Sequence, residues 1–168
     1  MNNEPRFIVD TMLGTVARWL RILGYDTVYD KSAEDWQIIR RAELEKRIIV
    51  TRDRGLHIKA IKSGIKSILL WEDDMPDRLA HIALVSGIQL GIDFNRTRCP
   101  EDNTILVKAE KEKIKSKVPP GVYSVHNDFW ECPRCGKVYW IGNHWRQIEK
   151  ILKEARDKLE ILKVKSRL

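Results

Sequence analysis

Acidic residues follow several short apolar runs in the first half of the chain. If those runs are parallel strands, their carboxyl ends meet at one edge of the sheet and the acids gather there. Because like charges repel, a fold that gathers them normally supplies a cation. Hard oxygen ligands favour Mg²⁺ or Mn²⁺, which can activate a water to cut a phosphodiester. The pattern therefore predicts nuclease chemistry at these positions: Asp10, Asp30, Asp53, and the run Glu72, Asp73 and Asp74.

The cysteines are a second group of residues whose spacing suggests a chemical role. Cys132 and Cys135 are separated by two residues and followed by a glycine, which is the spacing of a zinc knuckle. Cys99 is the third cysteine, and Asp102 stands where a fourth would be expected. Three alternatives follow: Asp102 is the fourth zinc ligand, a histidine (His126 or His144) replaces it, or the site holds no metal. Three cysteines are too few for a disulfide framework.

Other interpretations of the acidic pattern are less favoured. A haloacid-dehalogenase-like phosphatase needs a second aspartate two positions after the first, and Met12 stands there. A receiver-like phosphoacceptor domain needs a lysine at a strand end, and the sequence offers no convincing one. Each aspartate alone is better explained as a helix cap or loop acid, so the joint occurrence at several strand ends carries the metal-site prediction.

The elements that must position these groups are short. In the first part β-branched runs alternate with helical patterns, which predicts an α/β fold with a parallel sheet flanked by helices. Ser32 and Asp35 form a capping-box pattern at the start of one helix. The predicted strands are residues 7–9, 27–29, 48–50 and 68–70, and the predicted helices cover 11–23, 32–46, the segment after the third strand to about 63, and 76–86.

The second part of the chain has another character. The region from about Phe94 to Tyr139 contains all three cysteines, a lysine-rich run and the breaker Pro119-Pro120-Gly121, which favour a hairpin-based module. From about Asn143 the apolar spacing becomes helical again, with basic residues on the other face. We expect three units: a nuclease domain over 1–94, a zinc-ribbon module over 95–142 and a basic C-terminal helix over 143–168.

The two parts of the chain also differ in net charge. Residues 1–94 contain 14 Lys and Arg against 14 Asp and Glu, and residues 95–168 contain 17 against 10, so the whole net charge of +7 lies in the second part. This distribution suggests that the basic part attracts a polyanion, and a solvated lysine-rich surface explains it equally well. No apolar run reaches the roughly 18 residues of a membrane span, and the first residues lack a secretory pattern. We therefore expect a soluble, cytoplasmic protein.

Aromatic and basic residues surround the cysteine pair. They are able to stack bases and hold phosphates, or alternatively to form the small core of the ribbon. The core interpretation is favoured for Trp130, Tyr139 and Trp140. The residues concerned are Phe129, Trp130, Tyr139, Trp140, His144 and Trp145, interleaved with Arg134, Lys137 and Arg146, and a lysine series at Lys108, Lys111, Lys113, Lys115 and Lys117.

Four stretches together resemble a known family. FIVDTMLGTVARWLRILGYDT, TRDRGL, RCPEDN and PPGVYSVHNDFWECPRCGKVYWIGNHW are similar to the PIN-like RNase domain found at the C-terminus of Mut-seven exonuclease-type proteins. The resemblance covers roughly Arg6 to Ile151. It implies a PIN-like fold with a structural Zn²⁺ ribbon, and RNA hydrolysis that depends on Mg²⁺ or Mn²⁺.

The resemblance also implies roles for individual residues. Asp10, Asp35 and Asp53 would be the catalytic acids that hold the ion, with Asp73 or Asp74 as a further acid. The family knuckle usually has a second cysteine at the position of Asp102, so the zinc site Cys99, Asp102, Cys132 and Cys135 departs from the pattern there. The expected substrate-binding residues, each with surface ion pairing or packing as its alternative, are Arg18, Arg21, Arg52, Arg54, Lys137 and Trp145.

These observations predict a metal-dependent ribonuclease, that is, a hydrolase acting on phosphodiester bonds. The main alternative is a noncatalytic zinc-ribbon module that binds RNA or acts as an adaptor. A toxin-type PIN nuclease is a second alternative, which the zinc ribbon disfavours.

Overall fold

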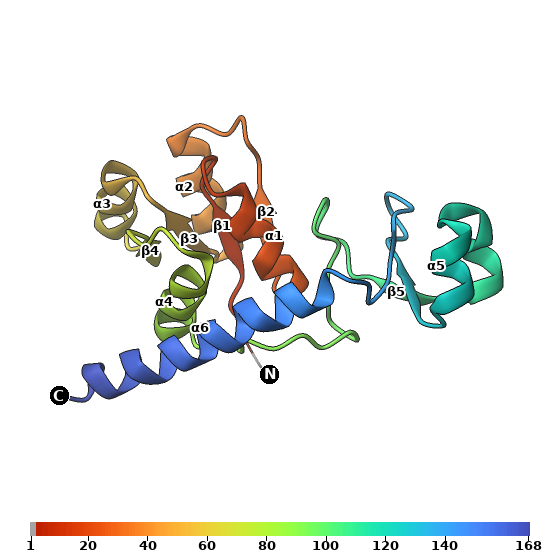
Figure 1. Ribbon diagram of the computed structural model, residues 1–168. Helices are drawn as coiled ribbons and strands as arrows, with labels where there is room; N and C mark the ends of the chain where they lie inside the picture. The colour runs from red at the N-terminus through yellow and green to blue at the C-terminus, as the bar shows by residue number, and fades with distance from the viewer. Residues whose placement is uncertain (1–2) are drawn as a thin grey trace.

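A four-stranded parallel sheet organises the first part of the protein. The computed structural model describes residues 3–168 and is shown in Figure 1. The strands lie in the order β2-β1-β3-β4, and Val9 at the end of β1 is level with Tyr29 of β2 and Val50 of β3. The residues that follow the four strands therefore share one edge, here called the carboxyl edge. The strands are β1 (Phe7–Val9), β2 (Thr27–Tyr29), β3 (Ile48–Thr51) and β4 (Ser67–Leu69).

Helices cover both faces of this sheet. Side chains alternate along β1, so Phe7 and Val9 join one buried cluster while Ile8 joins the other. The first cluster packs against α1, α4 and α6, and the second against α2 and α3. This arrangement confirms the predicted α/β class. The helices are α1 (Gly14–Ile22), α2 (Asp35–Glu45), α3 (Arg54–Lys62), α4 (Met75–Ser86) and α6 (Trp145–Ser166).

The C-terminal helix α6 returns across the sheet domain and lies along α4 (Figure 1). Its residues Leu152, Ala155 and Leu159 recur at helical spacing and are buried in the first cluster. Lys158 Nζ also lies 2.8 Å from Asp77 Oδ1 on α4. The last part of the chain therefore completes the core that the first part begins. None of the described helices is long and apolar enough to cross a membrane.

A smaller antiparallel sheet with the order β5-β6-β7 follows in sequence, as the hairpin prediction anticipated. Phe129 and Trp130 of β6 are buried in two small cores on its two sides. The lysine-rich segment forms a 3₁₀ helix, and the residues after Pro119 form a short α-helix; the sequence pattern indicated neither. The division of the chain at residues 94 and 142 stays a prediction. The elements are β5 (Val107–Ala109), η1 (Lys111–Lys117), α5 (Pro120–Val125), β6 (Phe129–Glu131) and β7 (Val138–Tyr139).

The predicted cap of α2 was wrong. The N-cap is Glu34, whose backbone N donates to Gln37 Oε1 at 2.8 Å, whereas the sequence pattern paired Ser32 with Asp35. Ser32 instead donates its backbone N and its hydroxyl to Asp30 Oδ1, at 2.9 and 2.7 Å. The reason is local competition, because an aspartate two positions earlier captures the serine in its own turn.

Candidate functional site

Asp10 lies at the centre of the carboxyl edge and is only 7% exposed. Its backbone N donates to Val50 O at 2.9 Å, which joins the end of β1 to β3. Its carboxylate accepts from Thr11 N at Oδ1 and from the Thr51 hydroxyl at Oδ2, both at 2.7 Å. These contacts fix the orientation of the carboxylate. Each carboxylate oxygen has two lone pairs, so acceptor capacity remains for a further ligand.

Asp53 follows β3 and is tied to Asp10 through one hydroxyl. Its backbone N donates to Thr51 Oγ1 at 2.9 Å, and the same hydroxyl donates to Asp10. Asp53 Oδ1 accepts from Gly55 N at 2.7 Å and from Leu56 N at 3.2 Å, so the side chain caps α3. Sequence reasoning missed Thr51. The available signal was a hydroxyl residue at the end of an apolar strand, two positions before an acid.

The other predicted acids lie farther apart along the same edge. Asp35 is the first residue of α2, with Oδ2 4.0 Å from Lys59 Nζ. Asp73 is exposed, and its Oδ1 lies 3.3 Å from Arg52 Nη2, while Asp74 is the N-cap of α4. Within residues 3–168, ligand atoms of three or more acidic, histidine or cysteine residues come within 4.8 Å of one another only at the cysteines. A shared metal-binding role for the aspartates stays a prediction.

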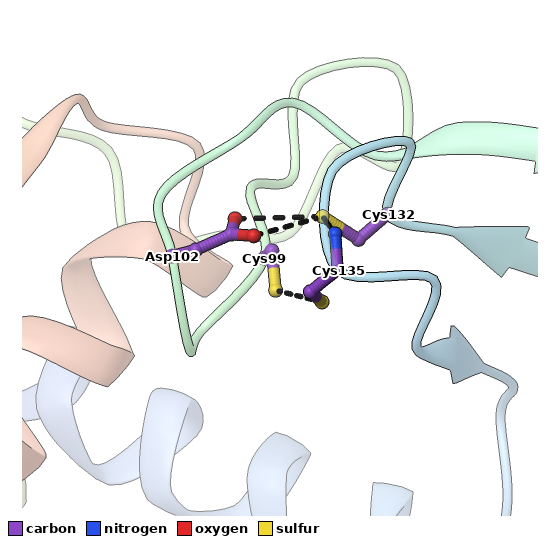
Figure 2. Close-up of side chains that lie close together, drawn as sticks. All are labelled: Cys99, Asp102, Cys132 and Cys135. Carbon is purple, nitrogen blue, oxygen red and sulfur yellow. Dashed lines mark hydrogen bonds between the residues drawn. The ribbon is translucent and has the colours of Figure 1, made fainter.

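The second predicted site is assembled from two loops (Figure 2). Cys99, Asp102, Cys132 and Cys135 bring one ligand atom each to within 4.8 Å of the others. Cys99 Sγ lies 3.8 Å from Cys135 Sγ, and Cys132 Sγ lies 3.3 Å from Asp102 Oδ2. Ligands of tetrahedral zinc lie about 3.8 Å apart for two sulfurs and about 3.6 Å for sulfur and oxygen. The donor set therefore fits a metal such as zinc, and neither His126 nor His144 belongs to it.

Protonation differs between the two kinds of ligand in this cluster. Burial raises the pKa of the Cys132 thiol to about 11. Burial also acts to raise the pKa of Asp102, but hydrogen bonds, first from Thr104 N, outweigh it and lower the pKa to about 2. Asp102 is thus a carboxylate at neutral pH, ready to act as an oxygen ligand. Thiol ligands must lose their protons when a metal binds, so metal affinity should increase with pH.

The loop that carries Cys99 and Asp102 is docked onto the sheet domain. Arg21 is 6% exposed, and it donates to Thr27 O at 2.9 Å and to Pro100 O at 2.8 Å. Asn103 Oδ1 accepts from Thr27 N at 3.0 Å. Substrate binding and surface ion pairing, which were the predictions for Arg21, both need an accessible guanidinium, whereas the docked loop buries this one. Thr27 begins β2, so the cysteine cluster lies at the opposite end of the β1–β2 pair from Asp10.

Asn103 also connects the loop to a charged group that sequence reasoning did not single out. Its Nδ2 donates to Asp26 Oδ1 at 2.8 Å, and Arg47 Nη1 lies 2.9 Å from the same oxygen. Burial acts to raise the pKa of Asp26, but the hydrogen bonds from Arg47 and Asn103 outweigh it and hold the pKa well below its ordinary value. Asp26 is therefore charged at neutral pH and anchors the loop.

The remaining predicted substrate-binding residues have varied surroundings. Arg18 Nη1 and Lys137 Nζ both approach Glu101 Oε1, at 2.5 and 3.5 Å, and so link α1 with the knuckle loops. Arg54 is exposed at the start of α3, beside Asp53. Trp145 stacks on Phe94 with 5.3 Å between ring centroids, which gives it a packing role. The core interpretation of Trp130, Tyr139 and Trp140 is confirmed, since each belongs to or packs against a small core.

Comparison with known proteins gives one finding about the whole arrangement. A family model described as the Mut7-C RNAse domain matches residues 5–152, which contain both the carboxyl edge and the cysteine cluster. No curated protein and no solved structure matches the chain. The match suggests a nuclease-like role with RNA as substrate or partner, and it agrees with the resemblance noted in the sequence. By this match, which covers most of its length, the chain belongs to the Mut7-C RNAse domain family.

Proposed function

We propose that this protein is a PIN-type, metal-dependent ribonuclease that hydrolyses RNA phosphodiester bonds at Asp10, Asp35 and Asp53. The observation that carries the proposal is the linked pair of acids, in which the Thr51 hydroxyl donates to Asp10 and accepts from Asp53 N. The groups that hold the two carboxylates are neutral donors, namely backbone N–H groups and one hydroxyl. Their negative charges are therefore available to a cation.

The residues fit a hard divalent cation. Asp10 and Asp53 offer oxygen donors from the neighbouring strands β1 and β3, and Asp35 offers one from the helix after β2. Bound Mg²⁺ or Mn²⁺ would supply a Lewis acid and an activated water for phosphodiester hydrolysis. Asp10 is held rigidly, which keeps its carboxylate in one position during the reaction. Asp73 or Asp74 would complete the acidic set from the β4 side.

Basic groups in two places would hold the RNA strand. Arg52 and Arg54 flank Asp53 in sequence; Arg52 Nη2 lies 3.3 Å from Asp73 Oδ1 and Arg54 is exposed, and we assign both to contacts with phosphates next to the cleaved bond. Farther away, Lys111 and Lys115 lie 4.8 and 5.7 Å from the ring centroid of Tyr123. We assign this lysine-rich segment to sequence-independent phosphate contacts, which weaken with added salt.

The cysteine cluster would have a structural role in this account. We propose that it binds zinc through Cys99, Asp102, Cys132 and Cys135 and so holds the two loops of the ribbon together. Its position at the other end of the β1–β2 pair keeps it away from Asp10. The zinc would stabilise the docked loop and take no part in cleavage.

Cleavage of a labelled RNA by the purified protein tests the proposal. We expect cutting in Mn²⁺ or Mg²⁺, no cutting in EDTA, and at least a hundredfold loss of rate in Asp53→Asn. An adaptor protein predicts a different result: RNA binding without cleavage in any of these conditions. Cutting that persists in EDTA, or that is equal in wild type and variant, would reject the proposed site.

A further inference from the structure

Among the described residues 3–168, two tryptophans are exposed, and both lie at the carboxyl edge. Trp36 is 58% exposed in the first turn of α2, and Trp71 is 69% exposed two residues after β4. Met12, which follows β1, is also exposed at this edge. The four other tryptophans, at positions 19, 130, 140 and 145, are buried or half-buried. Exposed aromatic rings are the groups on which many proteins stack the bases of a nucleic acid.

Both exposed rings are held in defined orientations by neighbouring side chains. Trp36 Nε1 donates to Glu34 Oε2 at 2.7 Å. The Trp71 ring packs against His81, with 4.5 Å between ring centroids and an interplanar angle of 49°. His81 Nδ1 in turn lies 2.7 Å from Glu72 Oε1. Rings that are already ordered lose little conformational freedom when a planar ligand stacks on them.

The strand order places these rings on the two sides of the proposed cleavage site. Trp36 follows the outer strand β2 and Trp71 follows the outer strand β4, while Asp10 and Asp53 follow β1 and β3 between them. Three strand spacings of about 4.8 Å separate β2 from β4, or roughly 14 Å. Arg52, which follows the inner strand β3, lies at the same edge, with its Nη2 3.3 Å from Asp73 Oδ1. Aromatic faces on both sides of an acidic pair that would hold a cation match the bases on either side of a phosphate bound at that cation.

We propose that Trp36 and Trp71 stack unpaired nucleobases on either side of the phosphodiester held at Asp10 and Asp53. The substrate is then single-stranded RNA, because bases in a duplex are stacked on one another and present only their edges. This inference rests on the proposed nuclease function for the position of the cleaved bond. The stacking itself needs no catalysis, and it can therefore be measured separately.

Fluorescence anisotropy in EDTA measures binding without cleavage. Three labelled RNAs are compared: a single strand, the same strand in a duplex, and the single strand with abasic residues in place of bases. We expect Trp36→Ala and Trp71→Ala each to weaken single-strand binding about tenfold, with partial recovery in Trp71→Phe. Val164→Ala, which changes an exposed apolar residue on α6, should bind as wild type does.

The abasic strand provides a test that needs no variant. Wild type should bind it more weakly than either single tryptophan variant binds the normal strand, because the abasic strand lacks both stacking partners, and the variants should bind the abasic strand as weakly as wild type does. Equal binding of normal and abasic strands by wild type, or unchanged single-strand affinity in both alanine variants, would overturn the proposal. Weakened binding in these variants together with no cleavage in any metal would support the stacking and reject the nuclease function.

Discussion

Asn103 joins the cysteine-bearing loop to the sheet domain, and replacing it tests how strongly the two are coupled. Its side chain accepts from Thr27 N at 3.0 Å and donates to Asp26 Oδ1 at 2.8 Å. Its backbone has a φ of 73°, in the left-handed region that asparagine tolerates better than most residues. Asn103→Ala removes both hydrogen bonds and leaves the backbone strained.

The expected loss in the free energy of unfolding follows from these contacts. A hydrogen bond to a charged group contributes about 1.5–3 kcal/mol and a neutral one about 1 kcal/mol. Because Asn103 is half-buried, water can replace part of the lost hydrogen bonding in the variant. We therefore expect the loss of the two hydrogen bonds to cost about 2 kcal/mol. The left-handed backbone adds about 1 kcal/mol for alanine but no strain for glycine. Asn103→Ala should therefore lower the free energy of unfolding by about 3 kcal/mol, and Asn103→Gly by about 2 kcal/mol.

Urea denaturation at fixed zinc concentration provides the assay, with Asn103→Gly as the matched control for the backbone. The difference between the two variants isolates the strain, and their common loss isolates the side-chain contacts. Stability of Asn103→Ala within about 0.5 kcal/mol of wild type would refute the coupling. A glycine variant clearly less stable than the alanine variant would refute the backbone part of the reasoning.

Three further predictions concern single groups. Thr51→Val removes the hydroxyl shared by Asp10 and Asp53 and should slow RNA cleavage about tenfold or more. Thr51→Ser keeps a hydroxyl and should cleave at a rate near that of wild type. Equal cleavage rates in Thr51→Val and wild type would contradict the positioning role of Thr51. Metal analysis should find roughly one zinc per chain in wild type and much less in Cys132→Ser, which should also melt at a lower temperature; equal zinc content in the two proteins would reject the site. Asp26 has a lowered pKa, so its stabilising contribution is present above the ordinary carboxyl pKa and is lost as pH falls through the folded value. Asp26→Asn should therefore be about 2 kcal/mol less stable than wild type at pH 7, and chemical denaturation should show this gap shrinking below about pH 4; a constant gap would contradict the assignment.

The sequence predicted the sheet well because its strands are nearly continuous apolar runs. The strands at 7–9 and 27–29 have the predicted bounds, the third extends one residue further, and the fourth begins and ends one residue earlier than predicted. A strand buried on both faces needs apolar side chains at every position, and such a run is visible without knowledge of its partners. The same strands place Asp10 and Asp53 at neighbouring ends of the sheet, as expected.

Features that depend on distant contacts were not predictable from local patterns. Asn103 bonds to residues more than 70 positions away, and Arg21 is buried by the loop at Pro100. No periodicity in either segment indicates this docking. The exposure of Trp36 and Trp71 was equally hidden, because a tryptophan next to a strand or helix is more often part of a core.

The helical structure of the lysine-rich segment was also not predictable from the sequence. Its 3₁₀ helix buries Ile114 alone among lysines and polar residues. One buried residue gives no helical repeat, so the pattern resembles a solvated loop. The short helix α5 has no buried residue of its own and begins after Pro119, where a turn was expected.

Single-turnover cleavage of a single-stranded RNA in Mn²⁺, comparing Asp10→Asn with Asp157→Asn, tests the central claim most directly. Both variants remove one carboxylate charge, but Asp157 pairs with Lys153 on the exposed side of α6. The account predicts at least a hundredfold loss of rate in Asp10→Asn and a rate near wild type in Asp157→Asn, with both proteins folded. Equal rates in the two variants would contradict a catalytic centre at the carboxyl edge.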